Sequence, residues 1–157
     1  MRQAIGNYLE QQIHAADAVQ LICLYYRQCI KAVREAREAI ASGNIAAKGK
    51  RISLAHRILA ELYRSLDFQT GDGALARELG RLYSYMMRKL IEANARQAED
   101  ELCEIQGLLS SLLESWEEVS RGSIFTSTAP AAESQAAPDR WRVPEDAGEH
   151  REYSYSF

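Results

Sequence analysis

The sequence predicts an all-α protein: an antiparallel up-and-down four-helix bundle followed by a disordered C-terminal tail. Within residues 1–120, apolar residues recur at alternating steps of three and four, which keeps them on one side of an α-helix. Strand-type alternation of comparable length is absent from that region. All three prolines, Pro130, Pro138 and Pro144, come later in the sequence. A chain of 157 residues therefore has room for one helical core and a tail.

Four apolar stripes define the four helices. The first is Val19, Ile22, Tyr26, Cys29, Val33, Ala36 and Ile40, and the second is Ile52, Ala55, Leu59, Leu62 and Leu66. The third is Leu75, Leu79, Leu82, Met86, Leu90 and Ala93, and the fourth is Leu102, Ile105, Leu109, Leu112, Trp116 and Val119. Connections of roughly 5 to 9 residues between helices of about 20 let each helix fold back on its predecessor.

Residues that favour helix ends separate these stripes. Asp17, with Gln20 three positions later, is typical of an N-cap and predicts that the first helix begins there. Gly43 suits the end of that helix, because glycine adopts the left-handed conformation easily. Asp72 is expected to cap the third helix. The acidic run 99–101 suits the N-terminus of the fourth helix, where the helix dipole favours negative charge.

The segment ahead of the first helix, residues 1–16, is predicted to be an arm that packs on the bundle. Tyr8, Leu9 and Ile13 are apolar, but the segment is too short to fold alone. It lacks the apolar core and cleavage site of a secretory signal, so we expect a cytoplasmic protein. No apolar run approaches the ~20 residues that cross a bilayer, so we expect no membrane insertion.

Residues 121–157 are predicted to form the disordered tail. Their first half is rich in Ser, Thr, Ala and Pro, and it cannot bury enough apolar area to offset the entropy of ordering. Near the end, Tyr153, Tyr155 and Phe157 alternate with serine. This end is either a solvated extension or a weak competitor for a binding groove. Truncation after Arg121 distinguishes the two, because only a competitor would weaken partner binding while present.

Signals for catalysis, metal binding or a bound cofactor are absent from the sequence. A di-iron site in a helical bundle needs Glu-x-x-His pairs, and His14, His56 and His150 form no ligand set. No P-loop, dinucleotide fingerprint or nucleophile elbow is present. The three cysteines lie far apart in apolar helical patterns and are interpreted as reduced apolar residues. We therefore expect a protein that is not an enzyme and binds no metal or cofactor.

The charge is unevenly distributed along the chain. The net charge of −3 gives no support for nucleic-acid binding. Residues 48–96, the basic segment, carry ten Lys and Arg against five Asp and Glu, whereas residues 97–120, the acidic segment, carry seven acidic residues and no basic one. Either neighbouring helices complement each other in charge, or the basic segment forms a patch for an acidic partner.

Apolar residues outside the core stripes form a candidate binding groove. Ile58 lies beside the stripe of the second helix, and Tyr83, Met87 and Ile91 recur at four-residue spacing in the third. Methionine adapts its shape and tyrosine combines a broad apolar ring with a polar end, so both suit a surface that receives a partner. The alternative is that these residues widen the core, and the pattern alone leaves both interpretations open.

A series of ordered motifs runs from Tyr8 to Val119. They are Tyr8, Ala16, Leu21-Ile22, Tyr26, Ala55, Ile58, Glu61-Leu62, Ser65-Leu66-Asp67, Leu79, Leu82-Tyr83-Ser84-Tyr85-Met86, Leu90, Ala93-Asn94, Glu104-Ile105, Leu108-Leu109 and Trp116. In this order they resemble the bacterial flagellar export chaperone family FliS. The sequence departs from the family pattern at Asp17-Ala18, Tyr25, Arg27-Gln28 and Ala98.

The resemblance implies a four-helix bundle that binds the C-terminal segment of flagellin, a segment that is disordered when free and wraps around the chaperone. Binding would prevent premature polymerisation and keep flagellin competent for flagellar type III secretion. Export-gate and flagellin-regulatory proteins are further candidate partners. The client-binding residues predicted on this basis are Tyr8, Ile13, Ile58, Leu62, Tyr83, Met87 and Ile91.

Two alternative functions stay open. One is a helical adaptor or phosphotransfer-like signalling module, for which His56 would have to be an exposed phosphoacceptor. The other is a diverged chaperone for a different secreted client. Arg27-Gln28 suggests this second alternative, because the family usually has Asp-Gly there, and the change adds bulk and reverses a charge.

Overall fold

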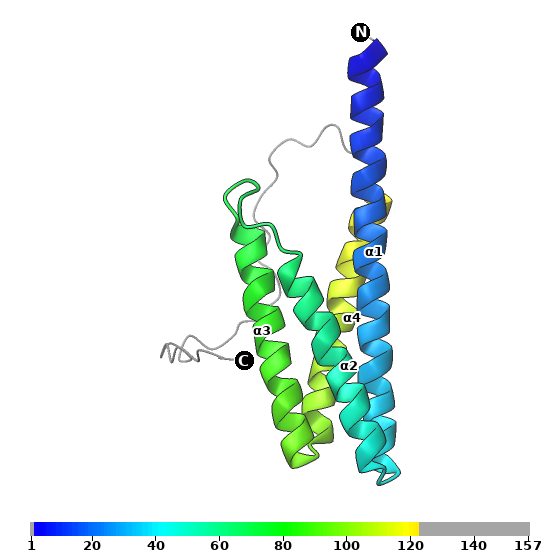
Figure 1. Cartoon of the computed structure of the whole chain (residues 1–157), viewed down its shortest axis with the longest axis vertical. Coiled ribbons are helices and arrows are strands. Elements are labelled where there is room, and N and C mark those ends of the chain that lie inside the picture. Colours follow the sequence, from blue (N-terminus) through cyan, green and yellow to red (C-terminus); the bar gives the residue numbers. More distant parts are fainter. Residues whose placement is uncertain (1, 123–157) are drawn as a thin grey trace. The chain divides into compact units, whose positions relative to one another are not determined.

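The computed structural model describes residues 2–122, which form four α-helices and no strand (Figure 1). The helices are α1 (Arg2–Ala41), α2 (Ile45–Arg64), α3 (Ala74–Arg96) and α4 (Glu99–Gly122). Successive helices run in opposite directions, and α1 and α3 each pack against both α2 and α4. The predicted all-α four-helix fold is therefore confirmed. The predicted disordered tail, residues 121–157, lies outside the described residues except for Arg121 and Gly122, which end α4.

The turn between α1 and α2 follows from two consecutive residues, Gly43 and Asn44. Gly43 has a φ of 71°, a left-handed conformation that glycine adopts without strain, and it ends α1 as predicted. Asn44 then caps α2, because its side-chain oxygen accepts a hydrogen bond from the Ala47 N–H at 3.0 Å.

The start of α3 differs slightly from the expectation. Gly73 occupies the N-cap position with a φ of 66°, so Asp72 lies one residue before the cap. Asp72 nevertheless supplies the missing acceptor, because its side chain accepts a hydrogen bond from the Ala74 N–H at 2.9 Å. A Cβ atom at Gly73 would meet the Phe68 carbonyl oxygen at 2.6 Å, so only glycine fits this turn.

At the opposite end of α3 a buried lysine satisfies a helix terminus. Gln97 adopts a left-handed conformation and ends α3, although the sequence has no glycine there. The ammonium of Lys48, near the start of α2, is buried and donates a hydrogen bond to the Asn94 carbonyl at 2.8 Å. A cation suits this position because the C-terminus of a helix carries partial negative charge.

The first helix begins much earlier than predicted. It runs without a break from Arg2, so Asp17 lies inside the helix and is not its N-cap. An exposed aspartate costs a helix interior only ~0.7 kcal/mol, which the Ala, Leu and Gln residues around it offset. The predicted arm is therefore a helical continuation of α1, which we call the α1 extension (residues 2–16). It does not pack on the bundle, because Tyr8, Leu9 and Ile13 are more than half exposed.

One stripe of each helix forms the core. The buried residues include Tyr26, Cys29, Val33 and Ala36 of α1, Ile52, Ala55, Leu59 and Leu62 of α2, Leu79, Met86, Leu90 and Ala93 of α3, and Leu102, Ile105 and Leu109 of α4. Two predicted members are wrong, because Leu75 is 67% exposed and Val119 is also exposed. Leu75 lies in the first turn of α3, where the neighbouring Ala76 takes the buried position, and Val119 lies in the last turn of α4.

A polar contact crosses this core between helices that do not otherwise pack together. The hydroxyls of Tyr26 in α1 and Tyr83 in α3 are hydrogen-bonded, and their ring centroids lie 6.4 Å apart. Trp116 of α4 donates its indole N–H to the Tyr26 hydroxyl at 3.3 Å. Burial raises the pKa of both tyrosines, so both hydroxyls stay neutral. The contact fixes the register of three helices at once.

The ion pairs between helices show which helices complement each other in charge. Arg27 pairs with Glu117 at 2.5 Å and Arg37 pairs with Glu99 at 3.1 Å, so the acidic segment meets arginines of α1. Within residues 2–122, no ion pair joins the basic segment to the acidic segment. Neighbouring helices do complement each other in charge, but the pairs join α1 to α4 and, through Arg51 and Glu35 at 3.0 Å, α2 to α1.

We predict that Tyr83→Phe lowers the free energy of unfolding by about 1 kcal/mol at pH 7, because it removes one buried hydrogen bond and keeps the ring. Stability should also fall less steeply above about pH 10 in this variant. Burial raises the pKa of Tyr83 in the folded state, so the unfolded chain loses that proton at lower pH than the folded chain does. The free energy of unfolding of the protein with Tyr83 therefore falls as pH rises, and the variant lacks this contribution. Urea unfolding at pH 7 and pH 10.5 measures both effects.

Tyr63→Phe is the matched control, because Tyr63 is exposed and lies on α2 outside the core. It should change neither the stability at pH 7 nor its slope with pH. Equal behaviour of the two variants would show that the Tyr26–Tyr83 hydrogen bond contributes nothing to the fold.

Candidate functional site

The structure divides the seven predicted binding residues into a buried group and an accessible group. Ile58, Leu62 and Tyr83 belong to the hydrophobic core. The expectation that Ile58 and Tyr83 lie on an open groove was wrong, and the alternative that they widen the core is correct. Their position leaves them no surface to offer to a partner unless the bundle opens.

The geometry of α3 explains why the predicted ridge did not form. Residues four apart on an α-helix are rotated by about 40° relative to each other, because four steps exceed one turn of 3.6 residues. The line from Tyr83 through Met87 to Ile91 therefore turns from the core to the solvent. Tyr83 is 2% exposed, Met87 is partly buried against the core, and Ile91 is 56% exposed.

Among the residues that the structure describes, the largest set of exposed apolar side chains lies on the α1 extension. Figure 1 shows that this part of α1 projects past the ends of the other three helices, so no helix covers it. Four of its side chains, Ile5, Tyr8, Leu9 and Ile13, are between 51% and 60% exposed. Two of the seven predicted binding residues belong to this set.

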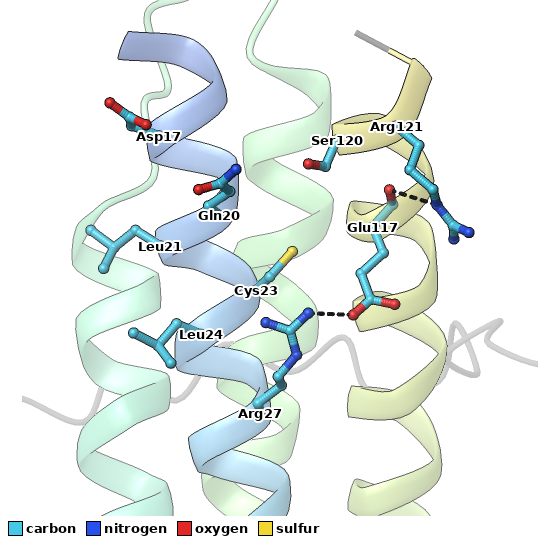
Figure 2. Close-up of a pocket in the computed structure, with 9 residues that line it drawn as sticks. All are labelled: Asp17, Gln20, Leu21, Cys23, Leu24, Arg27, Glu117, Ser120 and Arg121. Atoms are coloured by element: carbon cyan, nitrogen blue, oxygen red, sulfur yellow. Dashed lines mark hydrogen bonds and ion pairs between the residues drawn. The ribbon is translucent and has the colours of Figure 1, made fainter. Parts of the chain in front are cut away.

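Further down α1, the same side of the helix lines a groove against α4 (Figure 2). The groove residues are Asp17, Gln20, Leu21, Cys23, Leu24 and Arg27 of α1, and Glu117, Ser120 and Arg121 of α4. Ile5, Leu9, Ile13, Gln20 and Leu24 follow one another at steps of four or seven, which places them on one side of α1. The exposed stripe of the extension therefore continues into the groove.

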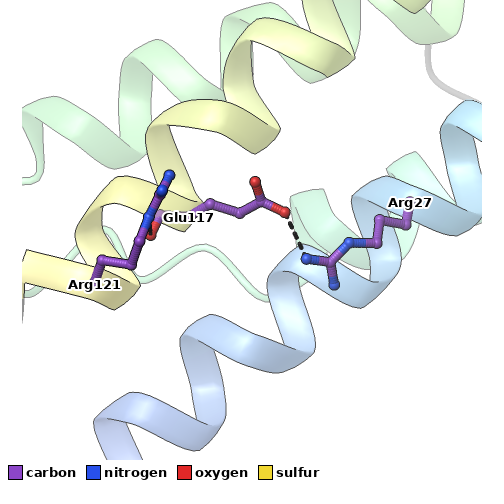
Figure 3. A network of polar contacts seen from close by, with 3 residues as sticks. All are labelled: Arg27, Glu117 and Arg121. Carbon is purple, nitrogen blue, oxygen red and sulfur yellow. Dashed lines mark hydrogen bonds and ion pairs between the residues drawn. The ribbon is translucent and has the colours of Figure 1, made fainter.

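An ion pair bridges this groove. The Arg27 guanidinium contacts the Glu117 carboxylate at 2.5 Å, and Arg121 donates a hydrogen bond from Nε to the Glu117 carbonyl at 3.3 Å (Figure 3). Glu117 thus lies between two arginines. Because Arg27 is exposed, the pair adds little to stability, about 0–1 kcal/mol, and a partner can displace it.

The sequence offered no direct signal for this groove. Its α4 wall is made of polar residues, Glu117, Ser120 and Arg121, which are typical of any solvated helix end. Two of its residues, Asp17 and Arg27, depart from the family pattern, but neither departure indicates a groove. The groove depends on how close the last turns of α4 come to α1, which a single helix does not reveal.

Within residues 2–122, no three His, Cys, Asp or Glu side chains come together as a metal site. His56 is partly buried on α2. In the same part of the chain, every helix is too short or too polar to span a bilayer. What the surface does present is a long apolar stripe with a charged groove at its lower end.

A family model of flagellar protein FliS matches residues 1–123, which include all four helices. The chain belongs to the FliS family. The flagellar secretion chaperone FliS of Salmonella typhimurium is 34% identical over 118 residues, covering 74% of this chain and 87% of the relative. FliSB of Pseudomonas aeruginosa is 34% identical over 120 residues, covering 76% and 94%, and FliS of Bacillus subtilis is 26% identical over 111 residues, covering 71% and 81%.

Family membership confirms the resemblance that the sequence motifs indicated. This FliS protein is a flagellar secretion chaperone, and its family is not enzymatic. The family match ends one residue after α4, so the alternating aromatic residues near the end of the chain belong to the part outside it. Family membership therefore favours a binding role for the exposed apolar stripe of α1.

We predict that Leu90→Glu and Ile91→Glu have opposite effects on folding, although the residues are neighbours. Leu90 is fully buried, so an unpaired carboxylate there costs several kcal/mol and should unfold the bundle. Ile91 is exposed, so the same change should alter the free energy of unfolding by less than about 0.5 kcal/mol. Thermal melts followed by circular dichroism test the pair. Unfolding of Ile91→Glu would place Ile91 in the core.

Proposed function

We propose that this FliS protein binds the C-terminal segment of flagellin in the cytoplasm, keeps flagellin from polymerising early and holds it ready for flagellar type III secretion. The observation that carries the proposal is the coincidence of a FliS family match with a long exposed apolar stripe on α1. Its named relatives are flagellar secretion chaperones. Export-gate and flagellin-regulatory proteins remain candidate partners.

The stripe and the groove suit a client that is disordered when free. A disordered segment has few contacts of its own and can lay its apolar residues along an extended surface as it folds. The ordering entropy that it loses on binding keeps the affinity moderate, which export requires because the client must be released.

The accessible residues among the seven predictions are the proposed direct contacts. Tyr8 and Ile13 lie on the α1 extension, whereas Met87 and Ile91 lie on α3. Because these two surfaces are on different helices, one rigid helix would not cover both, but a client that wraps around the bundle would. The buried residues Ile58, Leu62 and Tyr83 would act indirectly, by holding the helices that present this surface.

Titration calorimetry with a flagellin C-terminal peptide tests the proposal. We expect heat at micromolar concentrations and a gain in helical circular dichroism as the peptide folds. Ile13→Glu should weaken binding at least ten-fold without lowering the melting temperature, because the residue contacts no core in the free protein.

Gln11→Glu is the matched control for this experiment. It adds the same charge to the α1 extension two residues away, outside the apolar stripe, and should leave the affinity within about two-fold. An absence of heat with the unaltered protein would contradict the flagellin client. Equal losses in both variants would indicate a general effect of charge and contradict the stripe as the contact.

A different secreted client is the alternative that one observation supports. Arg27, a departure from the family pattern, lies in the groove and bridges it to Glu117. Arg27→Asp would place two carboxylates together and open the bridge. If flagellin uses this groove, the variant should change peptide affinity several-fold. An unchanged affinity would show that the groove serves another partner or none.

A further inference from the structure

We propose that the last part of α4 opens from the folded bundle as a flap, and that the surface it uncovers on α1 takes an apolar helix of the client. The flap is residues 112–122, and its hinge is residues 107–111 of the same helix. Opening is a property of the free protein. Only the identity of the occupant rests on the proposed function.

The two halves of α4 are held unequally. The first half places three fully buried side chains in the core, whereas no side chain in residues 110–122 is buried. The flap contacts the core through three partly buried side chains, Leu112, Leu113 and Trp116. Segments with few buried apolar contacts open at a lower free energy than the whole fold. The flap is therefore the part of α4 that can leave the bundle separately.

The polar contacts of the flap are also weak. Trp116 donates its indole N–H to the Tyr26 hydroxyl at 3.3 Å, which is long for such a bond. Glu117 pairs with Arg27, but 54% of the arginine side chain and 35% of the glutamate side chain are exposed, and exposed pairs add little stability (Figure 3). The first half of α4 is instead tied to α1 by Arg37, which contacts two of its side chains.

The residues between the two halves favour a bend. Gly107 is exposed inside the helix, and a Cβ atom there would meet no other helix within 4 Å, so packing does not require glycine. Glycine weakens a helix interior. Ser110 and Ser111 follow, and the Ser115 hydroxyl donates a hydrogen bond to the Ser111 carbonyl at 3.1 Å, a contact that often bends helices. Kinks occur at glycine and serine pairs, which places the hinge here.

Opening would uncover the floor of the groove between α1 and α4. Cys23 lines that groove together with Glu117 and Ser120, yet it is only 3% exposed, and its side chain is directed towards α4 (Figure 2). Tyr26, about one turn further along α1, is also buried and contacts the flap through Trp116. The uncovered part of α1 is therefore largely apolar, and it adjoins the exposed stripe of the α1 extension.

An amphipathic helix is the occupant that this surface fits. In the closed form α4 packs there with Leu109, Leu112 and Trp116, which follow one another at steps of three and four. A replacement needs apolar residues at the same spacing. A client segment that becomes helical on binding supplies such a stripe. The flap thus covers part of the client site in the free protein and leaves it when the client binds.

Thiol labelling of the full chain without any client tests the opening. Cys103→Ser removes the exposed cysteine, which leaves the buried Cys23 and Cys29. Cys29 contacts the Ala55 carbonyl of α2, so opening of α4 does not release it. A maleimide should label Cys23 at least ten-fold faster than Cys29, as measured by digestion and mass spectrometry. Equal rates would show that only global unfolding exposes both thiols and would overturn the flap.

Gly107→Ala tests the hinge. Alanine strengthens the helix at a position with open space, so labelling of Cys23 should slow roughly five-fold. Gly49→Ala is the matched control, because Gly49 has the same open space within α2 and lies away from the groove. It should leave the labelling rate of Cys23 within about two-fold. Equal effects of the two variants would overturn the hinge.

Client binding tests the exchange of the flap for the client. In a Trp141→Phe variant, Trp116 is the only tryptophan. A flagellin C-terminal peptide should shift its fluorescence to longer wavelength, as the ring enters water, and should slow the labelling of Cys23. Gly107→Ala should weaken peptide binding roughly five-fold, because only the open form binds.

The remaining outcomes separate this proposal from the proposed function. A bound peptide that leaves the fluorescence of Trp116 unchanged would overturn the exchange while the flagellin client stands. A peptide that does not bind would contradict both the flagellin client and the occupant named here. The opening is decided in either case by the labelling of Cys23, because that measurement uses no client.

Discussion

The length of α1 is the constraint on which the other features depend. It has 40 residues, whereas the other three helices have 20 to 24, and all four share one bundle. The other helices cover α1 from about Asp17 onwards, and they leave its first part, the α1 extension, without a neighbouring helix. The exposure of Ile5, Tyr8, Leu9 and Ile13 on the α1 extension follows from this mismatch.

The core and the binding surface are separated along α1. Tyr26 is buried and holds Tyr83 and Trp116 together across the bundle, while Ile13, about three and a half turns earlier, is exposed. A partner can therefore cover or leave the extension without disturbing the hydrogen bonds in the core. This separation suits a chaperone, because its client must bind and be released while the chaperone remains folded.

Electrostatics acts at the junction between these two regions. Arg27 and Glu117 bridge the groove between α1 and α4, below the α1 extension, and Arg121 donates a hydrogen bond to the Glu117 carbonyl. An exposed pair of this kind contributes little to stability, so a partner could displace it at little cost to the fold. Because Arg27 departs from the family pattern, the groove is where this chain can differ from its relatives.

The sequence by itself determined the number of helices, their core stripes, the turn at Gly43 and the family. These depend on periodicity and on local backbone preferences, which act within a few residues. Only the tertiary structure decided that Tyr83 is buried, that Leu75 is exposed and that the helix continues through Asp17. Periodicity gives the direction of a side chain on its own helix. It does not give how far the neighbouring helix extends, and burial requires both.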